Sequence, residues 1–332
     1  EKNLNPTMKE RFQMKKYQWG IVGLGTIAHE FAESFNQETS ELTAVASRTS
    51  EKAEKFAHRY NIPKAYGSYQ EMLDDAEIDI IYIAVPNKQH IDHILAALEA
   101  GKHVLCEKAI TMNKKELADA MRLAEEKNLI LAEAMTIFNM PLYQQLRSIM
   151  DTGKLGALKM IQAPFGSYKE PDPENRFFNP ELAGGALLDI GTYAVSFARF
   201  FLSSQPEVVA STMVPFETGV DEQSVTILRN KENELAAVSL TFQAKMPKVG
   251  IVAFENGYVT IADYPRADRA EILFTDGTKE FIESGRTSEA MNYEINNNMV
   301  HMIEGDLPNR SLFLTKDVID ILDQMQVLWK NM

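Results

Sequence analysis

The chain has 332 residues, longer than one hydrophobic core usually supports, and its 45% apolar and 24% charged residues are the balance of a globular protein. Its 34 Lys and Arg stand against 47 Asp and Glu, and the resulting net charge of -13 would repel a nucleic acid. The single cysteine, Cys106, excludes an internal disulfide and favours a cytoplasmic protein. The longest apolar run, residues 80–85, is far shorter than the roughly 20 residues that cross a membrane. We therefore expect two domains and no nucleic acid or membrane partner.

The amino-terminal part of the chain alternates short apolar runs with helical periodicity. Residues 1–16 are polar and show no period, so we expect a native extension or an expression remnant, with Met8 or Met14 as possible natural starts. From Tyr17 onward the pattern predicts strands at 17–22, 42–46, 78–85, 103–106 and 129–132, and helices at 27–36, 51–60, 90–100 and 114–127. Strands this uniformly apolar suit a parallel sheet covered by helices on both faces, so residues 17–134 are predicted to form a doubly wound Rossmann domain.

The pattern changes after residue 134. A helix at 141–150 is predicted to end at Gly153, and short strands then follow at 157–163, 207–214, 223–229, 235–243, 249–255, 258–262, 270–274 and 279–283. The pairs Asn256-Gly257 and Asp276-Gly277 are typical of tight hairpins, and two helices, 288–304 and 315–330, close the chain. Residues 135–332 are therefore expected to form an α+β domain with a large, mostly antiparallel sheet. Self-association would cover its open face, which favours a homodimer or homotetramer.

A glycine turn joins the first strand to the first helix. Gly23 allows the tight turn, Gly25 lets the backbone approach a pyrophosphate, and Ala28 replaces the third glycine of the dinucleotide fingerprint, where helix and strand pack closely. The free N–H groups at the start of the helix, with Thr26 and Ile27, suit the phosphates. This turn predicts a dinucleotide-binding site.

The end of the second strand indicates which dinucleotide is bound. An NAD enzyme usually places an acidic residue here, whereas this chain has Ser47 and Arg48, which suit a 2'-phosphate. Lys52, one turn into the next helix, adds a second cation. We therefore expect NADP rather than NAD; the alternative is that Arg48 is only a solvated surface charge.

The third strand ends at Pro86, Asn87 and His90, and the carboxyl ends of parallel strands are where ligands bind. These three residues are expected to lie along the cofactor, although Pro86 and Asn87 could simply end the strand and cap the next helix. His90 and His93 lack a well-placed third ligand, so we expect no metal.

Together the glycine turn, residues 85–87 (VPN), residues 107–109 (EKA) and residues 184–193 (GGALLDIGTY) resemble the glucose-fructose oxidoreductase and inositol dehydrogenase (Gfo/Idh/MocA) family, nearest its dihydrodiol and xylose dehydrogenase-like branch. In that branch a tyrosine, here Tyr193, stands where sugar and inositol enzymes commonly have histidine. The resemblance implies hydride transfer between NADP and a CH–OH carbon of a sugar, polyol or dihydrodiol. Two departures bear on the substrate and the site: Ala109 replaces the usual proline, and residues 135–139 lack the branch's aromatic and basic residues.

The matched motifs place three residues in catalytic roles. Tyr193 is the candidate acid/base, with its pKa brought toward neutrality by Lys108 beside it, and Lys108 would also stabilise the developing alkoxide. Asp189 shares a helix face with Tyr193 and could orient the substrate or hold Lys108. Glu107 and Lys108 are expected beside the cofactor as well.

The residues that select the substrate are less clearly marked in the sequence. The loop 164–182 is expected to contact the substrate through Tyr168, Arg176 and Phe177, although it could equally be a lid or an interface. The alternative to an enzyme is a non-catalytic NADP-binding sensor of the same fold, which has no need of Lys108, Asp189 and Tyr193 together. The sequence leaves open the substrate and the direction of reaction.

Overall fold

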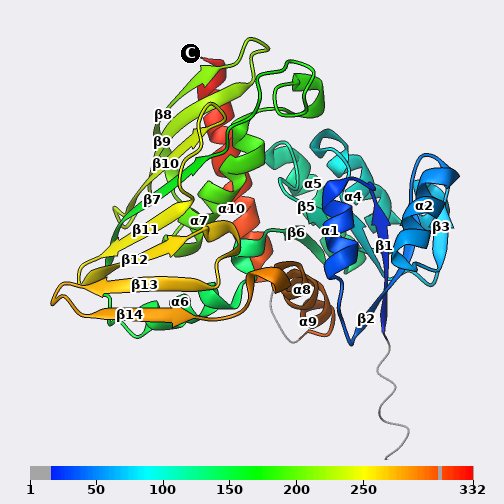
Figure 1. Ribbon diagram of the computed structural model, residues 1–332, viewed down its shortest axis with the longest axis horizontal. Helices are drawn as coiled ribbons and strands as arrows, with labels where there is room; N and C mark the ends of the chain where they lie inside the picture. The colour runs from blue at the N-terminus through cyan, green and yellow to red at the C-terminus, as the bar shows by residue number, and fades with distance from the viewer. Residues whose placement is uncertain (1–15, 306–308, 332) are drawn as a thin grey trace, which may run out of the picture.

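The computed structural model describes residues 16–305 and 309–331, and Figure 1 shows two large sheets side by side, joined by helices. The expectation for the amino-terminal extension concerns residues that lie almost entirely outside this range. None of the described helices is long and apolar enough to cross a membrane.

The first sheet is the predicted doubly wound one. Its six strands are all parallel, in the order β3-β2-β1-β4-β5-β6. The strands are β1 (Tyr17–Val22), β2 (Ser40–Ala46), β3 (Lys64–Tyr66), β4 (Ile80–Ile83), β5 (His103–Glu107) and β6 (Leu131–Ala134). The helices are α1 (Thr26–Ser34), α2 (Ser50–Tyr60), α3 (Tyr69–Leu73), α4 (His90–Glu99) and α5 (Lys114–Lys127). All four β4 residues are buried, because both faces of the sheet are covered.

Two elements of this first half are absent from the sequence prediction. Strand β3 has only three residues, none of them fully buried, so it carries no hydrophobic period. Helix α3 has five residues and begins where the Ser68 side chain accepts a hydrogen bond from the Glu71 N–H. Elements this short give too few repeats for a pattern to be read.

The second sheet has eight strands in the order β14-β13-β12-β11-β7-β10-β9-β8, and only β7 and β10 are parallel neighbours. The strands are β7 (Leu158–Gly166), β8 (Glu207–Pro215), β9 (Asp221–Arg229), β10 (Leu235–Thr241), β11 (Val249–Phe254), β12 (Gly257–Ala262), β13 (Arg269–Phe274) and β14 (Lys279–Glu283). Buried and exposed residues alternate along β9 and β11, so one face of the sheet is covered and the other is open. Both predicted hairpins form: Phe254 pairs with Gly257, and Gly277 takes a left-handed φ of 86° between β13 and β14. The mostly antiparallel α+β arrangement is confirmed.

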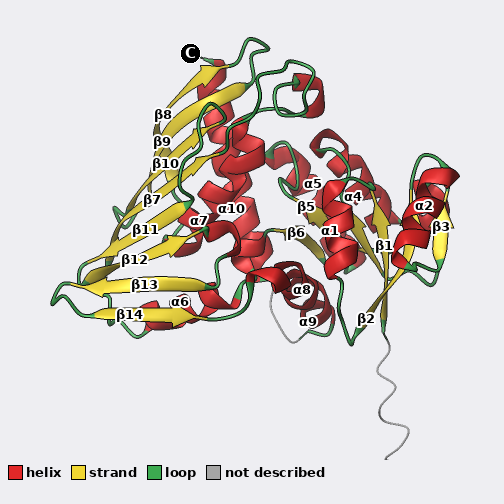
Figure 2. Cartoon of the chain, in the orientation of Figure 1, coloured by secondary structure: helices red, strands yellow, loops and turns green. Residues whose placement is uncertain are grey.

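Three helices pack between or beside the sheets: α6 (Pro141–Asp151), α7 (Thr192–Phe201) and α10 (Arg310–Lys330), with α7 and α10 on the inner face of the second sheet (Figure 2). Helix α6 ends before Gly153, whose φ of 77° fits the predicted left-handed cap. The predicted helix 288–304 forms as a continuous helical run of α8 (Ala290–Glu294), the π-helix η9 (Ile295–Val300) and α9 (His301–Ile303). Helix α10 begins earlier than predicted, after Asn309, whose side chain accepts from the Leu312 N–H.

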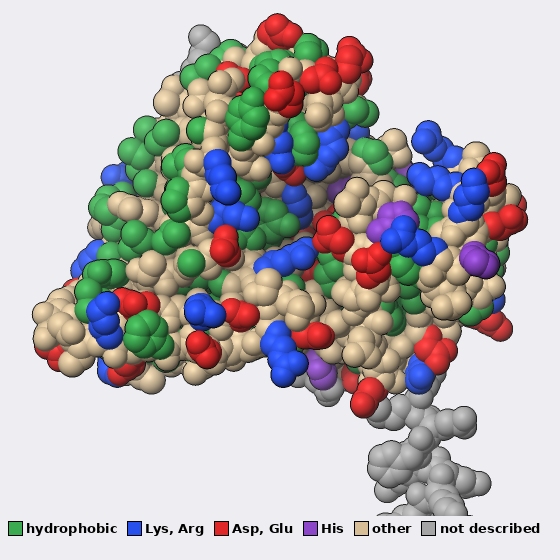
Figure 3. All heavy atoms as spheres, in the orientation of Figure 1, with side chains coloured by type: hydrophobic (Ala, Val, Ile, Leu, Met, Phe, Trp, Pro, Cys, Tyr) green, Lys and Arg blue, Asp and Glu red, His purple; other side chains and the backbone are tan. Residues whose placement is uncertain are grey.

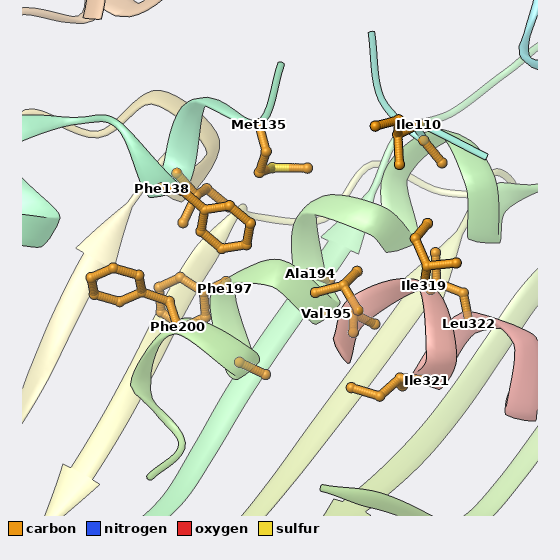
Figure 4. Close-up of a cluster of buried hydrophobic side chains, with 14 of the residues drawn as sticks. Ile110, Met135, Phe138, Ala194, Val195, Phe197, Phe200, Ile319, Ile321 and Leu322 are labelled. Atoms are coloured by element: carbon orange, nitrogen blue, oxygen red, sulfur yellow. The ribbon is translucent and has the colours of Figure 1, made fainter. Parts of the chain in front are cut away.

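A shared core fixes the two sheets relative to each other. Figure 4 shows Ile110 and Met135, from loops after β5 and β6, lying over α7 residues such as Ala194 and Val195, with α10 residues alongside. All four of these side chains are buried. Helix α7 is therefore held by apolar packing against the loops that follow strands of the first sheet.

Candidate active site

A cleft of about 1540 Å³ runs between the carboxyl edge of the first sheet and the second sheet. Its walls combine the glycine turn, the ends of β2, β4 and β5, the segment before α7 and the loop after β12. Lys and Arg side chains gather along the hollow between the two halves in Figure 3. A cleft of this size at this edge is the usual position of a ligand site in doubly wound folds.

The glycine turn lines one end of the cleft. Gly23 has a φ of 88°, and a Cβ there would collide with the backbone of Ala84, so only glycine fits. At Gly25 a Cβ would meet no protein atom within 4 Å, which leaves its side of the turn open to a ligand. No side chain caps the start of α1, and Thr26 and Ile27 lie on the cleft wall. Ala28 is fully buried and is not part of the wall.

Ser47, Arg48 and Lys52 line the same end of the cleft. Both cations are exposed, and within residues 16–305 and 309–331 no carboxylate lies within 4.0 Å of either. The only acid in the first turn of α2, Glu51, pairs instead with Lys55 at 2.6 Å. The cleft therefore offers two uncompensated positive charges where β2 ends.

Pro86, Asn87 and His90 also line the cleft. The His90 imidazole is buried, with Nδ1 2.9 Å from the Ala109 carbonyl oxygen and Nε2 2.8 Å from that of Val85. Burial lowers the pKa of His90, so the neutral ring is favoured and donates to one of these carbonyls. His90 thus links the loops after β4 and β5. Across the described ranges, no group of three His, Cys, Asp or Glu side chains is arranged to hold a metal.

The loop bearing Lys108 is held from several sides. The Lys108–Ala109 peptide bond is cis, the Ala109 carbonyl contacts His90, and the Ile110 N–H donates to Glu133 at 3.0 Å. Burial raises the pKa of Glu133 to about 7, and its other oxygen accepts from Thr315. These contacts fix the loop although Ala109 stands in place of the family proline.

Glu107, predicted beside the cofactor, lies on the cleft wall but has partners within the protein. Its carboxylate accepts from the Tyr82 hydroxyl at 2.5 Å and from the Lys108 N–H at 3.2 Å. Burial raises the pKa of Glu107, against the opposing effects of Tyr82 and Lys108. Its clearest role in the structure is to anchor the strand end that carries Lys108.

Lys108 and Asp189 form an ion pair inside the cleft. The ammonium donates to the Asp189 carboxylate at 3.1 Å and to the Asp189 carbonyl at 2.7 Å, and the two side chains are only 16% and 20% exposed. Burial alone would lower the pKa of Lys108 and raise that of Asp189. Their mutual attraction, together with neighbouring charges such as Glu107 for Lys108 and Arg176 for Asp189, outweighs burial, so the pKa of Lys108 is raised and that of Asp189 is lowered, and both are charged.

The segment carrying Asp189 and Tyr193 begins with the glycine pair Gly184 and Gly185. Gly185 has a φ of 119°, and a Cβ there would collide with the Asp221 carboxylate, which accepts the Leu187 N–H at 2.7 Å. The chain then forms the π-helix η6 (Leu187–Gly191), which continues into α7. Asp189 and Tyr193 therefore come from consecutive turns of one element, as their spacing predicted.

Tyr193 lies on the cleft wall, with the Lys108 ammonium 4.9 Å from the centroid of its ring. The expectation that Lys108 brings its pKa toward neutrality is wrong. Burial raises the pKa of Tyr193 above its ordinary value and outweighs the lowering effect of Lys108. At neutral pH the side chain is therefore a protonated phenol, equipped to give a proton.

Of the three residues predicted to contact substrate, Arg176 and Phe177 line the cleft and Tyr168 does not. Tyr168 is 55% exposed, and its hydroxyl lies 3.2 Å from Glu170. Sequence reasoning missed Lys248, Arg266 and Glu294, which line the cleft from just before β11, from the segment after β12 and from α8. These residues belong to no motif, and only the folding of distant segments brings them to the site.

Comparison with known families matches both halves of the chain. Residues 17–135 match the model of an oxidoreductase family with an NAD-binding Rossmann fold, and residues 143–280 match the GFO/IDH/MocA C-terminal domain. Together the two matches cover more than half of the sequence, including the glycine turn, Lys108, Asp189 and Tyr193.

Relatives are similar over most of their length. The chain is 34% identical over 293 residues to a trans-1,2-dihydrobenzene-1,2-diol dehydrogenase of Xenopus laevis, covering 86% of this chain and 87% of the relative. It is also 34% identical over 248 residues to the Mus musculus protein of that name, covering 74% of each.

Among solved structures, levoglucosan dehydrogenase in complex with NADH superposes with a TM-score of 0.86 at 19% identity, covering 96% of this chain and 98% of that one. KijD10, a 3-ketoreductase from Actinomadura kijaniata in complex with NADP and TDP-benzene, gives 0.82 at 22% identity, covering 94% and 98%. At these identities the likeness concerns the fold.

Proposed function

The chain belongs to the Gfo/Idh/MocA family of NAD(P)-dependent oxidoreductases, and from that premise we propose that it transfers a hydride between NADP and the hydroxyl or carbonyl carbon of a sugar, polyol or dihydrodiol. The observation that carries this proposal is the group Lys108, Asp189 and Tyr193, which shares one cleft with the glycine turn. A protein that only binds the cofactor has no use for a buried ion pair and a phenol at that position.

The residues present fit NADP. Gly25 leaves open space beside the uncapped start of α1, and Arg48 and Lys52 are uncompensated cations at the end of β2. We propose that the pyrophosphate is bound at Gly23, Gly25, Thr26 and Ile27, and that Ser47, Arg48 and Lys52 bind the 2'-phosphate. Pro86, Asn87 and Lys108 would border the rest of the cofactor. When bound, NADP supplies the hydride donor or acceptor.

This chain's own residues would manage the charge at the substrate oxygen. In carbonyl reduction, Tyr193 gives its phenolic proton to that oxygen, and the Lys108 ammonium stabilises the negative charge that develops. In alcohol oxidation the same proton returns to Tyr193. Asp189 holds Lys108 charged and aimed into the cleft through contacts at 3.1 and 2.7 Å.

Replacing Arg48 by alanine tests the cofactor preference. The Arg48→Ala protein should bind NADP about 10- to 100-fold more weakly and NAD as before, because a charge-assisted hydrogen bond to the 2'-phosphate is lost. Calorimetric titration with each cofactor measures both affinities. Arg59→Ala is the matched control, because Arg59 is an exposed arginine at the end of α2, paired with Glu33. Unchanged NADP affinity, or equal losses for NADP and NAD, would contradict the assignment.

The proposed reaction is tested by following NADPH absorbance over a panel of aldoses, inositols, diols and dicarbonyls. Turnover of at least one member is expected. A second candidate function, a non-catalytic NADP sensor, would give tight cofactor binding with no turnover across the panel.

We also propose that the open face of the second sheet joins two copies of the chain. Apolar side chains are exposed there, including Met160 at 45%, Val225 at 52% and Ile227 at 43%. Val225→Lys combined with Ile227→Lys should reduce the mass measured by light scattering from a multiple of 37.4 kDa to that of one chain. Phe313→Lys, at an exposed position on α10, should leave it unchanged. A native protein with the mass of one chain would refute the homodimer or homotetramer.

These assignments give each half of the chain its own role. We propose residues 17–134 as the dinucleotide-binding domain and residues 135–332 as the domain for substrate and self-association. We further propose a cytoplasmic location, supported by the buried, unpaired Cys106, since a fold without disulfides needs no oxidising compartment.

A further inference from the structure

Positive charge is in local excess around Asp189. The carboxylate pairs with Lys108 at 3.1 Å and lies 4.0 Å from the Arg176 guanidinium, and Lys169 is close enough for the same carboxylate to attract it. One carboxylate thus faces three cations. Of the three, only Lys108 donates a hydrogen bond to it, so Arg176 and Lys169 share a carboxylate that already has a closer cation.

Arg176 and Lys169 converge on one aromatic ring. The Arg176 Cζ lies 4.2 Å, and the Lys169 Nζ 4.1 Å, from the centroid of the Phe177 ring, which is part of the cleft wall. Within the part of the chain that the structure describes, no carboxylate lies within 4.0 Å of Lys169, and only Asp189 lies within that distance of Arg176. Two like charges are therefore held together at the cleft by a ring that attracts both.

This local excess of positive charge is unusual in a chain whose net charge is -13. In such a protein, carboxylates for pairing with Arg176 and Lys169 are plentiful, yet the fold places Arg176 on the cleft wall and Lys169 over the Phe177 ring, beside a carboxylate that Lys108 already pairs with. Holding cations close together disfavours their charged forms unless an anion approaches. A carboxylate or phosphate group, bound by the guanidinium fork and the ammonium, would supply the missing charge.

The cofactor is a poor candidate for that anion. Its phosphates are assigned to the glycine turn and to Arg48 and Lys52, on the first sheet. Arg176 and Lys169 belong to the segment between β7 and η6, which also leads into Asp189 and Tyr193. An anionic group bound there would be part of the substrate, whose reacting oxygen lies at Tyr193.

We infer that the substrate is an anionic sugar or polyol, whose carboxylate or phosphate is bound by Arg176 and Lys169 while its reacting carbon lies at Lys108 and Tyr193. The inference rests on the proposed function and narrows its substrate class. It sets this chain apart from an enzyme for a neutral aryl diol.

The test compares ligands that differ in charge. The NADP-loaded protein is titrated calorimetrically with D-glucose, D-glucuronate and D-glucose 6-phosphate, and turnover is measured with the same three. At least one anion should bind about 10-fold or more tightly than D-glucose, and the two anions together distinguish a carboxylate from a phosphate site. Arg176→Gln and Lys169→Met should each reduce the preference for the anion over D-glucose about 10-fold.

Two exposed cations over aromatic rings elsewhere serve as controls. Arg59 lies over Tyr60 at 5.2 Å, and Lys154 lies over Phe274 at 4.6 Å. Arg59→Gln and Lys154→Met should leave the anion preference intact. Equal binding of neutral and anionic ligands, or a preference that survives Arg176→Gln and Lys169→Met, overturns the anion site. Tight anion binding without turnover of any ligand would instead contradict the proposed function.

Discussion

The Tyr193→Phe protein is expected to lose about 10²- to 10⁴-fold in kcat, the usual contribution of a positioned acid/base. The phenyl ring retains the packing against Phe165 and the contact with the Lys108 ammonium, whose distances to the Tyr193 ring centroid are 6.2 and 4.9 Å. Folding and cofactor affinity should therefore be unchanged, and the loss should lie in kcat rather than in substrate binding. Steady-state kinetics together with NADP titration separate the two.

Tyr60→Phe is the matched control for this change. Tyr60 also uses its hydroxyl in hydrogen bonds, to Glu33 and His29, but it lies on α2 and is not part of the cleft wall. Its removal should leave kcat within about twofold, as for most surface changes. If Tyr193→Phe kept native turnover, another group would have to move the proton.

The Lys108→Met protein should lose about 10²- to 10³-fold in kcat, because the charge that stabilises the developing alkoxide is gone. Its pH profile should also change. Lys108 lowers the pKa of Tyr193, so without it that pKa rises further. The phenol is the acid in carbonyl reduction, so activity is lost as pH rises through this pKa. The alkaline limb of kcat should consequently move to higher pH in Lys108→Met.

Because Lys108→Met leaves the Asp189 carboxylate without its closest cation, a second variant is needed to separate a folding defect from a loss of catalysis. Lys108→Arg retains the positive charge and should fold as the native protein does while still losing activity, because the guanidinium cannot occupy the same contacts. Lys154→Met, far from the cleft, is the control for a lysine packed over an aromatic ring. An alkaline limb that stays in place or moves to lower pH would show that Lys108 does not act on Tyr193.

Local patterns predicted most of the fold. The sequence predicts strand β4 because the strand is apolar throughout, and it predicts helix α6 because Gly153 marks the helix end. The short β3 and the π-helical turn η9 were not predicted, since a three-residue strand has no period and a π-turn inside a helix has no distinct sequence pattern.

The candidate site could likewise be predicted only in part from the sequence. Gly23, Lys108, Asp189 and Tyr193 stand in local motifs, and the structure brings them to one cleft. The direction in which the pKa of Tyr193 shifts could not be read from its neighbours, because it depends on how deeply the fold buries the phenol. The cluster around Phe177 likewise escaped prediction, since charge compensation is a property of three-dimensional arrangement.

Transfer of deuterium from NADPH labelled at its hydride-donating carbon tests the central claim most directly. The native protein is incubated with labelled NADPH and a panel of sugar, inositol and sugar-acid carbonyl compounds, and the products are analysed by mass spectrometry. We expect deuterium at the carbinol carbon of at least one product, and about 1% or less of that rate with Tyr193→Phe. Tight binding of NADPH with no deuterium in any product would contradict the account and leave a cofactor-binding protein without hydride transfer.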